Sequence, residues 1–137
     1  KYYFEDIGIR NAVVDFRQIE FTHIMENVVY NELRKQGYTV DVGSVESFKR
    51  DENGKLQRRN LEIDFVVNRH DERLYIQSAF ALPDKEKEDQ EQASLLNVND
   101  GFRKLIIVGD RYHSGYNEEG ILMMSLSDFL LGKENKE

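Results

Sequence analysis

LEIDFVVNRHDERLYIQSAFAL, residues Leu61 to Leu82, is the stretch that decides the predicted fold. Apolar and polar residues alternate in both halves, and the polar segment 68–72 separates them, which predicts two β-strands joined by a tight turn. Because side chains alternate between the faces of a strand, we expect Glu62 and Asp64 on one face, with Gln77 beside them on the second strand. Four apolar residues of the first strand are expected together on the opposite face: Leu61, Ile63, Phe65 and Val67.

The polar face of this hairpin is a candidate metal site. Carboxylate and amide oxygens are the ligands that hard divalent cations prefer. Glu62, Asp64 and Gln77 would place two carboxylates and one amide side by side, which is a donor set for hydrolytic chemistry. The alternative reading of the same spacing is that both carboxylates are solvated residues of an ordinary hairpin.

The composition predicts a single globular domain over residues 1–137. Hydrophobic residues make up 39% and charged residues 33% of the chain, which is typical of a domain with a highly charged surface. No apolar run approaches the roughly 18 residues that a membrane helix needs, so we expect no membrane contact. The absence of cysteine excludes disulfides, thiolate catalysis and cysteine-ligated zinc, and it fits a cytoplasmic protein.

The first residues, Lys1-Tyr2-Tyr3-Phe4, do not include an initiating Met and already have a strand-like composition. We therefore expect the chain to be a fragment of a longer protein. Four helical segments are predicted: a turn at 7–14, a helix at 20–36 with Thr22 as a possible N-cap, a helix that opens at Pro83 and runs to Leu96, and a helix at 128–131 capped by Ser127. Three further strands are predicted at 38–45, 103–108 and 120–125. Residues 109–120 are predicted to form a polar loop. This order, αβββαβ at its centre, predicts a mixed α/β sheet flanked by helices.

A basic cluster lies in the polar segment 46–60, where Asn53-Gly54 is a strong hairpin signal. The segment 48–57 is therefore predicted to be a protruding ribbon. Its basic residues could contact nucleic acid or the acidic surface of a partner, and a plain solvated ribbon is the alternative. The net charge of −7 argues against strong binding of phosphate backbones unless basic residues cluster locally. The cluster consists of Lys49, Arg50, Lys55, Arg58 and Arg59.

Six segments together resemble the C-terminal domain of unknown function that follows the P-loop module in many prokaryotic AAA-type ATPases. The segments are KYYFEDIGIRNA (1–12), HIMENVVYNELRKQGY (23–38), VDVG (40–43), NLEIDFVV (60–67), LYIQSAFAL (74–82) and LLNVNDGFRKLIIVGD (95–110). That family is similar in fold to the PD-(D/E)XK nucleases, so the resemblance implies a restriction-endonuclease-like core. It also implies an ATPase module N-terminal to this domain, which would bind ATP. The chain itself contains no GxxxxGK[ST] phosphate-loop motif, so no cofactor is expected in this domain.

The resemblance implies a degenerate nuclease site. In the nucleases, an acid on the first helix, an Asp on the second strand and a Glu-x-Lys on the third hold Mg²⁺ and activate water. Carried over, these positions are Glu26, Asp64 and Gln77-Ser78-Ala79. Gln77 is a weaker metal ligand than a carboxylate, and Ala79 cannot replace the lysine. Lys85 or Lys87 could reach the site from the next helix.

We therefore expect a catalytically silent recognition domain that couples DNA or a protein partner to its own ATPase module. Two alternatives stay open. The first is an active Mg²⁺-dependent nuclease with a relocated lysine, in which Asp64 and Glu26 bind the metal. The second is a pure protein-interaction or oligomerisation module. The histidines His23, His70 and His113 have no metal-ligand spacing.

Overall fold

The computed structural model describes residues 21–109 and 112–133. Within these residues, helices alternate with strands in the predicted order αβββαβ, which is followed by two further strands and a helix. The helices are α2 (Phe21–Lys35), α3 (Lys85–Leu96) and α4 (Leu126–Leu130). The strands are β1 (Thr39–Arg50), β2 (Leu56–Arg69), β3 (Glu72–Ala79), β4 (Arg103–Val108), β5 (Gly115–Tyr116) and β6 (Leu122–Ser125).

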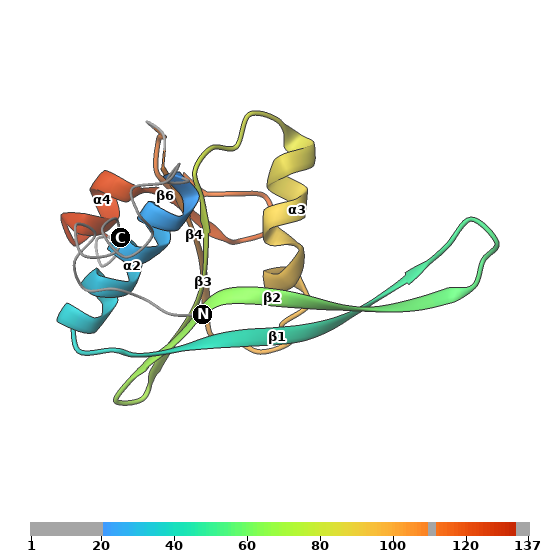
Figure 1. Ribbon diagram of the computed structural model, residues 1–137, viewed down its shortest axis with the longest axis horizontal. Coiled ribbons are helices and arrows are strands. Elements are labelled where there is room, and N and C mark those ends of the chain that lie inside the picture. Colours follow the sequence, from blue (N-terminus) through green and yellow to red (C-terminus); the bar gives the residue numbers. More distant parts are fainter. Residues whose placement is uncertain (1–20, 110–111, 134–137) are drawn as a thin grey trace, which may run out of the picture.

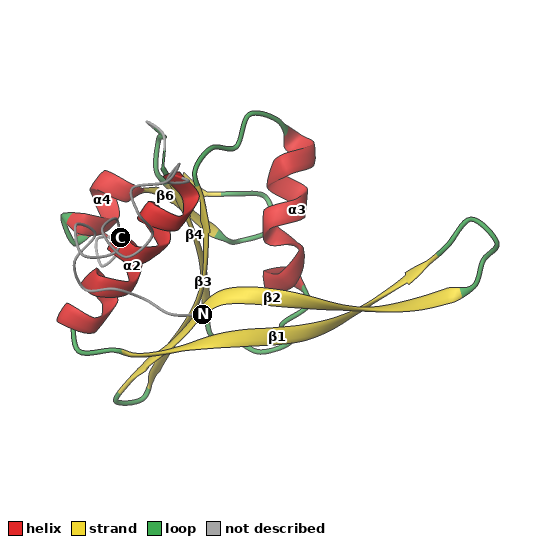
Figure 2. Ribbon diagram, in the orientation of Figure 1, coloured by secondary structure: helices red, strands yellow, loops and turns green. Residues whose placement is uncertain are grey.

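The six strands form one mixed sheet in the order β1-β2-β3-β4-β6-β5. Strands β1, β2 and β3 are antiparallel neighbours, whereas β3, β4 and β6 are parallel. Helices α2 and α4 lie on one side of the sheet and α3 lies on the other (Figures 1 and 2). The predicted mixed α/β sheet flanked by helices is therefore confirmed.

Each face of the sheet has its own hydrophobic core. On the first face, α2 buries Met25, Val29 and Leu33, which recur every four residues, and α4 contributes Phe129. These side chains pack with six residues of the sheet: Phe65, Val67, Ile76, Leu105, Ile107 and Met124. On the second face, Leu95 of α3 packs with Ile63, Tyr75, Ile106, Val108, Ile121 and Met123. Strand β4 is covered on both faces from Leu105 to Val108, which explains the unbroken apolar run of these four residues.

The long antiparallel pair β1–β2 extends well beyond the body of the domain (Figure 1). Its tip is held by Asp51, whose Oδ1 accepts hydrogen bonds from the backbone N–H groups of Asn53 (3.0 Å) and Lys55 (2.8 Å). Gly54 has φ +76°, a conformation that favours glycine. The predicted protruding ribbon is confirmed, and both strands are longer than the sequence indicated.

One prediction about the hairpin is wrong, because β2 contains a bulge. Asp41 pairs with Val66 but Gly43 pairs with Ile63, so two steps along β1 match three steps along β2. The extra residue reverses the side-chain alternation. Ile63 therefore lies in the core on the α3 side, whereas Phe65 and Val67 lie in the core on the α2 side. Leu61, Ile63, Phe65 and Val67 do not share one face.

The cap of the last helix also differs from the prediction. Ser125 is the N-cap of α4, and its Oγ accepts a hydrogen bond from the backbone N–H of Asp128 at 3.1 Å. Ser127, the predicted cap, lies inside the helix. The two serines are two residues apart, and only the backbone conformation decides which of them can reach a free N–H.

The start of α3 also differs from the prediction. Asp84, in an extended conformation, is the N-cap of α3, and its Oδ1 accepts from the N–H of Lys87 at 2.8 Å. Pro83 therefore precedes the cap and is not the first helical residue. Thr22 lies inside α2 and is not its N-cap.

The extended piece and helical turn predicted within residues 1–16 lie outside the described residues. The segment 109–120, predicted as a loop, contains the short strand β5, which pairs with β6. Among the described residues, no helix is long and apolar enough to cross a membrane.

Candidate functional site

Two of the predicted site residues, Asp64 and Gln77, meet at the point where β2 and β3 separate. The two strands pair from Arg69 and Glu72 up to Phe65 and Ile76, where the backbone pairing ends. At the next position of each strand, Asp64 and Gln77, the strands are joined by hydrogen bonds from side chains to backbone instead of by backbone–backbone hydrogen bonds. Gln77 Oε1 accepts a hydrogen bond from the backbone N–H of Asp64 at 2.6 Å. In return, Asp64 Oδ2 accepts from the backbone N–H of Ser78 at 2.9 Å.

This exchange is partly shielded from water. Gln77 and Ser78 are 7% and 5% exposed, and Asp64 is half-buried. A buried N–H without an acceptor costs free energy, so the two side chains supply acceptors that the separating strands no longer provide. Ser78 Oγ also donates to Asp64 Oδ2, at 3.3 Å. The strand split is thus stabilised by the residues that were predicted to form the metal site.

Helix α3 closes the site on its own side of the sheet. Gln77 Nε2 donates to the backbone carbonyl of Glu91 at 3.4 Å, so both ends of the Gln77 amide are engaged. The carboxylate of Glu91 forms an ion pair with Lys87, whose Nζ lies 2.8 Å from Glu91 Oε1. A helix-borne amine is therefore held one helical turn from the residue that contacts Gln77.

The remaining predicted members of the site are distributed around it. Glu26 is half-buried on α2, between the buried residues Met25 and Asn27. Glu62 is exposed on β2, opposite Ser44 of β1. Ala79 is buried and offers no polar group. Across residues 21–109 and 112–133, no three Asp, Glu or His side chains are grouped closely enough to hold one metal ion.

The two candidate lysines both form ion pairs within α3. Lys85 Nζ lies 3.6 Å from Glu88 and 3.4 Å from Asp89. Burial lowers the pKa of Lys85, but the hydrogen bond and charge of Asp89, with those of Glu88, outweigh it and raise that pKa overall. Of the two lysines, Lys87 is the one that pairs with Glu91, whose backbone carbonyl accepts from Gln77.

The five basic residues of the predicted cluster are all exposed on the ribbon. Cross-strand register places Phe48 opposite Arg58 and Leu56 opposite Arg50, so these four side chains share one face. Arg58 forms a close ion pair with Glu46 on the same face. Phe48 and Leu56 are 58% and 55% exposed, so each of these exposed apolar side chains lies opposite an arginine on this face.

Two contributors to the site were not predicted from the sequence. Ser78 is the middle residue of the degenerate motif, and its backbone N–H and its hydroxyl both donate to Asp64. Glu91 lies within the helix predicted from Pro83 to Leu96, and its backbone carbonyl contacts Gln77. No sequence signal marks a backbone carbonyl as a partner, so this second contact could not have been found without the fold.

The chain is similar to a protein of Haemophilus influenzae that is described only as uncharacterized. The two are 32% identical over 131 residues, which is 96% of this chain and 28% of the relative. The chain thus spans less than a third of the length of the curated relative it matches. No protein-family model matches the chain. No solved structure matches it either.

Proposed function

We propose that this chain is a catalytically silent, nuclease-like recognition domain of a cytoplasmic prokaryotic AAA-type ATPase. In this proposal the domain binds a nucleic acid or a protein partner and couples that partner to the ATPase module. The αβββαβ order and the mixed sheet support a restriction-endonuclease-like fold. The match covers 28% of the Haemophilus influenzae relative, so that longer protein has room for an ATP-binding module.

The hydrogen bonds between Asp64 and Gln77 support a silent site. In a metal-dependent nuclease these oxygens would face the cation. Here Asp64 Oδ2 accepts from the Ser78 N–H, and Gln77 Oε1 accepts from the Asp64 N–H. Both oxygens therefore take part in hydrogen bonds that join the two strands. Ala79 stands where an activating amine is needed. A Mg²⁺ ion would compete with these hydrogen bonds for the same oxygens.

The charge and the protrusion of the ribbon are the observations that support the recognition role. Residues 46–60 contain five basic and three acidic residues, a net charge of +2 on a chain of net charge −7. Figure 1 shows this segment standing clear of the body of the domain. A two-stranded ribbon is narrow enough to enter the major groove of DNA, and its basic residues would contact phosphates. These features favour nucleic acid as the ligand of the ribbon.

A mobility-shift titration with double- and single-stranded oligonucleotides tests this role. Lys49→Glu combined with Arg59→Glu reverses two charges on one face of the ribbon. Arg34→Glu combined with Lys35→Glu makes the same change on the exposed end of α2 and is the matched control. We expect the ribbon variant to bind at least about tenfold more weakly, and binding to weaken with salt. Equal effects of both variants, or no binding at low salt, would leave the protein-interaction module as the better account.

An active nuclease is the second candidate, and the position of Lys87 favours it. The Lys87–Glu91 pair places an amine one turn along α3 from the carbonyl that contacts Gln77. If that amine were the relocated catalytic lysine, Lys87→Ala would abolish Mg²⁺-dependent cleavage, whereas Lys85→Ala would not. We expect neither variant to change cleavage, because we expect no cleavage that depends on this domain.

A further inference from the structure

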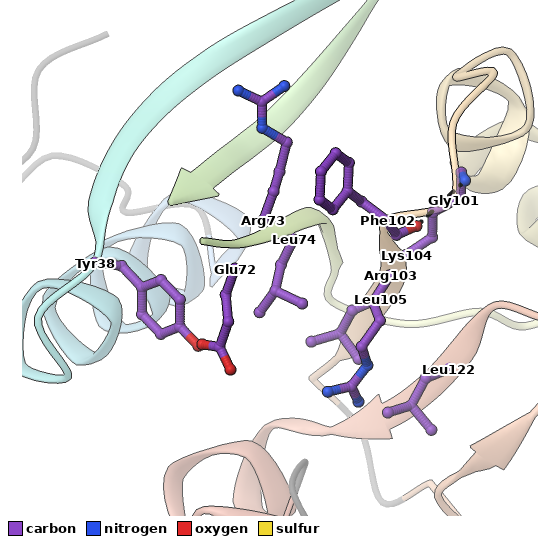
Figure 3. A pocket seen from close by; sticks show the side chains of 10 residues that line it. All are labelled: Tyr38, Glu72, Arg73, Leu74, Gly101, Phe102, Arg103, Lys104, Leu105 and Leu122. Atoms are coloured by element: carbon purple, nitrogen blue, oxygen red, sulfur yellow. Dashed lines mark hydrogen bonds between the residues drawn. The ribbon is translucent and has the colours of Figure 1, made fainter. Parts of the chain in front are cut away.

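A cavity of about 200 Å³ lies at the amino ends of β3 and β4, away from the Asp64–Gln77 site (Figure 3). It is formed by residues from four separate segments of the chain. They are Tyr38 before β1, the start of β3, the segment 101–105 that leads into β4, and Leu122 at the start of β6. Neither the predicted metal site nor the basic ribbon contributes a residue to it.

The floor of the cavity is apolar. Leu74, Leu105 and Leu122 belong to the core under α2 and α4, and they continue that core to the edge of the sheet. Leu105 is buried, and the other two are half-buried. Tyr38 lies at one side in Figure 3, and Phe102, which is 43% exposed, lies at the other. An apolar group placed here would remove leucine surface from water, which is favourable.

The rim is positively charged. Three basic residues line the cavity, Arg73, Arg103 and Lys104, against one acidic residue, Glu72. The Glu72 carboxylate accepts hydrogen bonds from Tyr38 Oη at 3.3 Å and from Arg69 at 3.1 Å. When Asp100, whose carboxylate lies close to Arg73 and Lys104, is counted beside Glu72, the rim has an excess of one positive charge, on a chain whose net charge is −7.

The rim is also held in place before any ligand arrives. Asp100 accepts a hydrogen bond from Tyr75 Oη at 2.5 Å and another from the N–H of Phe102 at 3.0 Å. The guanidinium of Arg73 lies 5.6 Å from the centre of the Phe102 ring, within the range of cation–π attraction. A pre-formed rim reduces the conformational entropy that is lost when a ligand binds.

We infer that this cavity binds an acidic segment of a partner protein, which inserts one large apolar side chain between flanking carboxylates. The volume is below the roughly 300–1,000 Å³ of most small-molecule sites, and it suits a single side chain. The apolar floor would take that side chain, and the basic rim would take the carboxylates. The inference does not depend on the ribbon or on nuclease ancestry, so it can fail or succeed separately from the proposed function.

The probe is a capped pentapeptide with a central phenylalanine and two glutamates on each side, titrated into isotopically labelled protein. We expect backbone amide shifts at Leu74, Phe102 and Leu105 that saturate. A matched peptide with a central alanine should bind at least about fivefold more weakly, because it loses most of the buried apolar area. A peptide with lysine in place of each glutamate should not bind.

Two variants test the cavity itself. Arg103→Glu, at the basic residue that points toward Leu105 and Leu122 in Figure 3, should weaken binding of the pentapeptide by about fivefold or more. Arg59→Glu on the ribbon, with the same charge change, should not weaken it. Phe102→Ala removes an exposed aromatic wall and keeps the proposal testable if Arg103→Glu fails to fold. Equal binding of the three peptides, or no shift at the cavity residues with millimolar peptide, would overturn the inference. Displacement of the peptide from these same residues by a single-stranded oligonucleotide would also overturn it.

Discussion

Asp64 and Gln77 join β2 and β3 where the strands cease to pair. Gln77 Oε1 accepts from the Asp64 N–H at 2.6 Å, and the Asp64 carboxylate accepts from the next residue of the opposite strand, Ser78, at 2.9 Å. The position that would hold a metal ligand in a nuclease-like domain thus carries a structural contact. This relationship leads to predictions about stability and about activity.

Asp64→Ala should lower the free energy of unfolding by about 1–3 kcal/mol, because it leaves the buried Ser78 N–H without its acceptor. Asp64→Asn should cost less, since the amide oxygen can still accept that hydrogen bond. Asp41→Ala removes an exposed carboxylate from the neighbouring strand and should stay within about 0.5 kcal/mol of the wild type. Urea titrations of the three variants measure the differences. Equal losses for Asp64→Ala and Asp41→Ala would argue against a structural role for Asp64.

Gly43→Ala should also destabilise the domain. A Cβ at Gly43 would lie 2.5 Å from Val66 Cγ2 and 3.2 Å from Ile63 Cβ, at the bulge in β2. Relieving this overlap requires movement of packed side chains, at a cost of about 1–3 kcal/mol. Gly101→Ala meets open space and is the control. A Gly43→Ala protein as stable as the control would mean that the bulge adapts freely.

Much of the fold could be predicted from the sequence because its signals are local. The alternation around residues 68–72, the Asn53-Gly54 turn and the four-residue spacing of Met25, Val29 and Leu33 each identified an element correctly. The bulge could not be predicted, because an apolar residue on either face of this sheet finds a core. Ile63 and Phe65 are both buried although they lie on opposite faces.

The candidate site was only partly predictable for a related reason. The motif positions identified Asp64 and Gln77, and the structure brings these two residues into contact. Sequence spacing describes which face a side chain occupies, but it does not show which backbone groups are left without partners when strands separate. The hydrogen bonds of Asp64 and Gln77 across the split depend on those groups. The contact from Gln77 to Glu91 depends on the packing of α3 against the sheet.

Ser125→Ala should lower the free energy of unfolding by about 1 kcal/mol, because the Ser125 Oγ accepts from the Asp128 N–H at the start of α4. Ser127→Ala replaces an exposed serine within the same helix and should have little effect. Thermal unfolding of both variants decides between the two caps. A larger loss for Ser127→Ala would restore the cap predicted from the sequence.

Tyr75→Phe should raise the pKa of Asp100. Desolvation on its own would raise that pKa, but the hydrogen bond from Tyr75, the Phe102 N–H and the charges of Lys104 and Arg73 hold it below the ordinary value. A lowered pKa contributes stability above the unfolded-state pKa, and this contribution is lost as pH falls through the folded-state pKa. The stability difference between wild type and Tyr75→Phe should therefore shrink in acid.

Carboxyl NMR titration of Asp100 measures this shift directly. Tyr116→Phe, at a tyrosine that is 69% exposed, is the control and should leave the titration unchanged. An Asp100 titration that is the same in Tyr75→Phe and in the wild type would show that the 2.5 Å contact does not set the pKa.

The most direct test of the silent-site account is a cleavage assay of the purified protein with Mg²⁺ and with Mn²⁺. Single- and double-stranded DNA and RNA are the substrates, and wild type is compared with folded Asp64→Asn. The account predicts that any trace of cleavage is the same in both proteins. Metal-dependent cleavage by the wild type that disappears in folded Asp64→Asn would contradict it and establish Asp64 as a metal ligand at work.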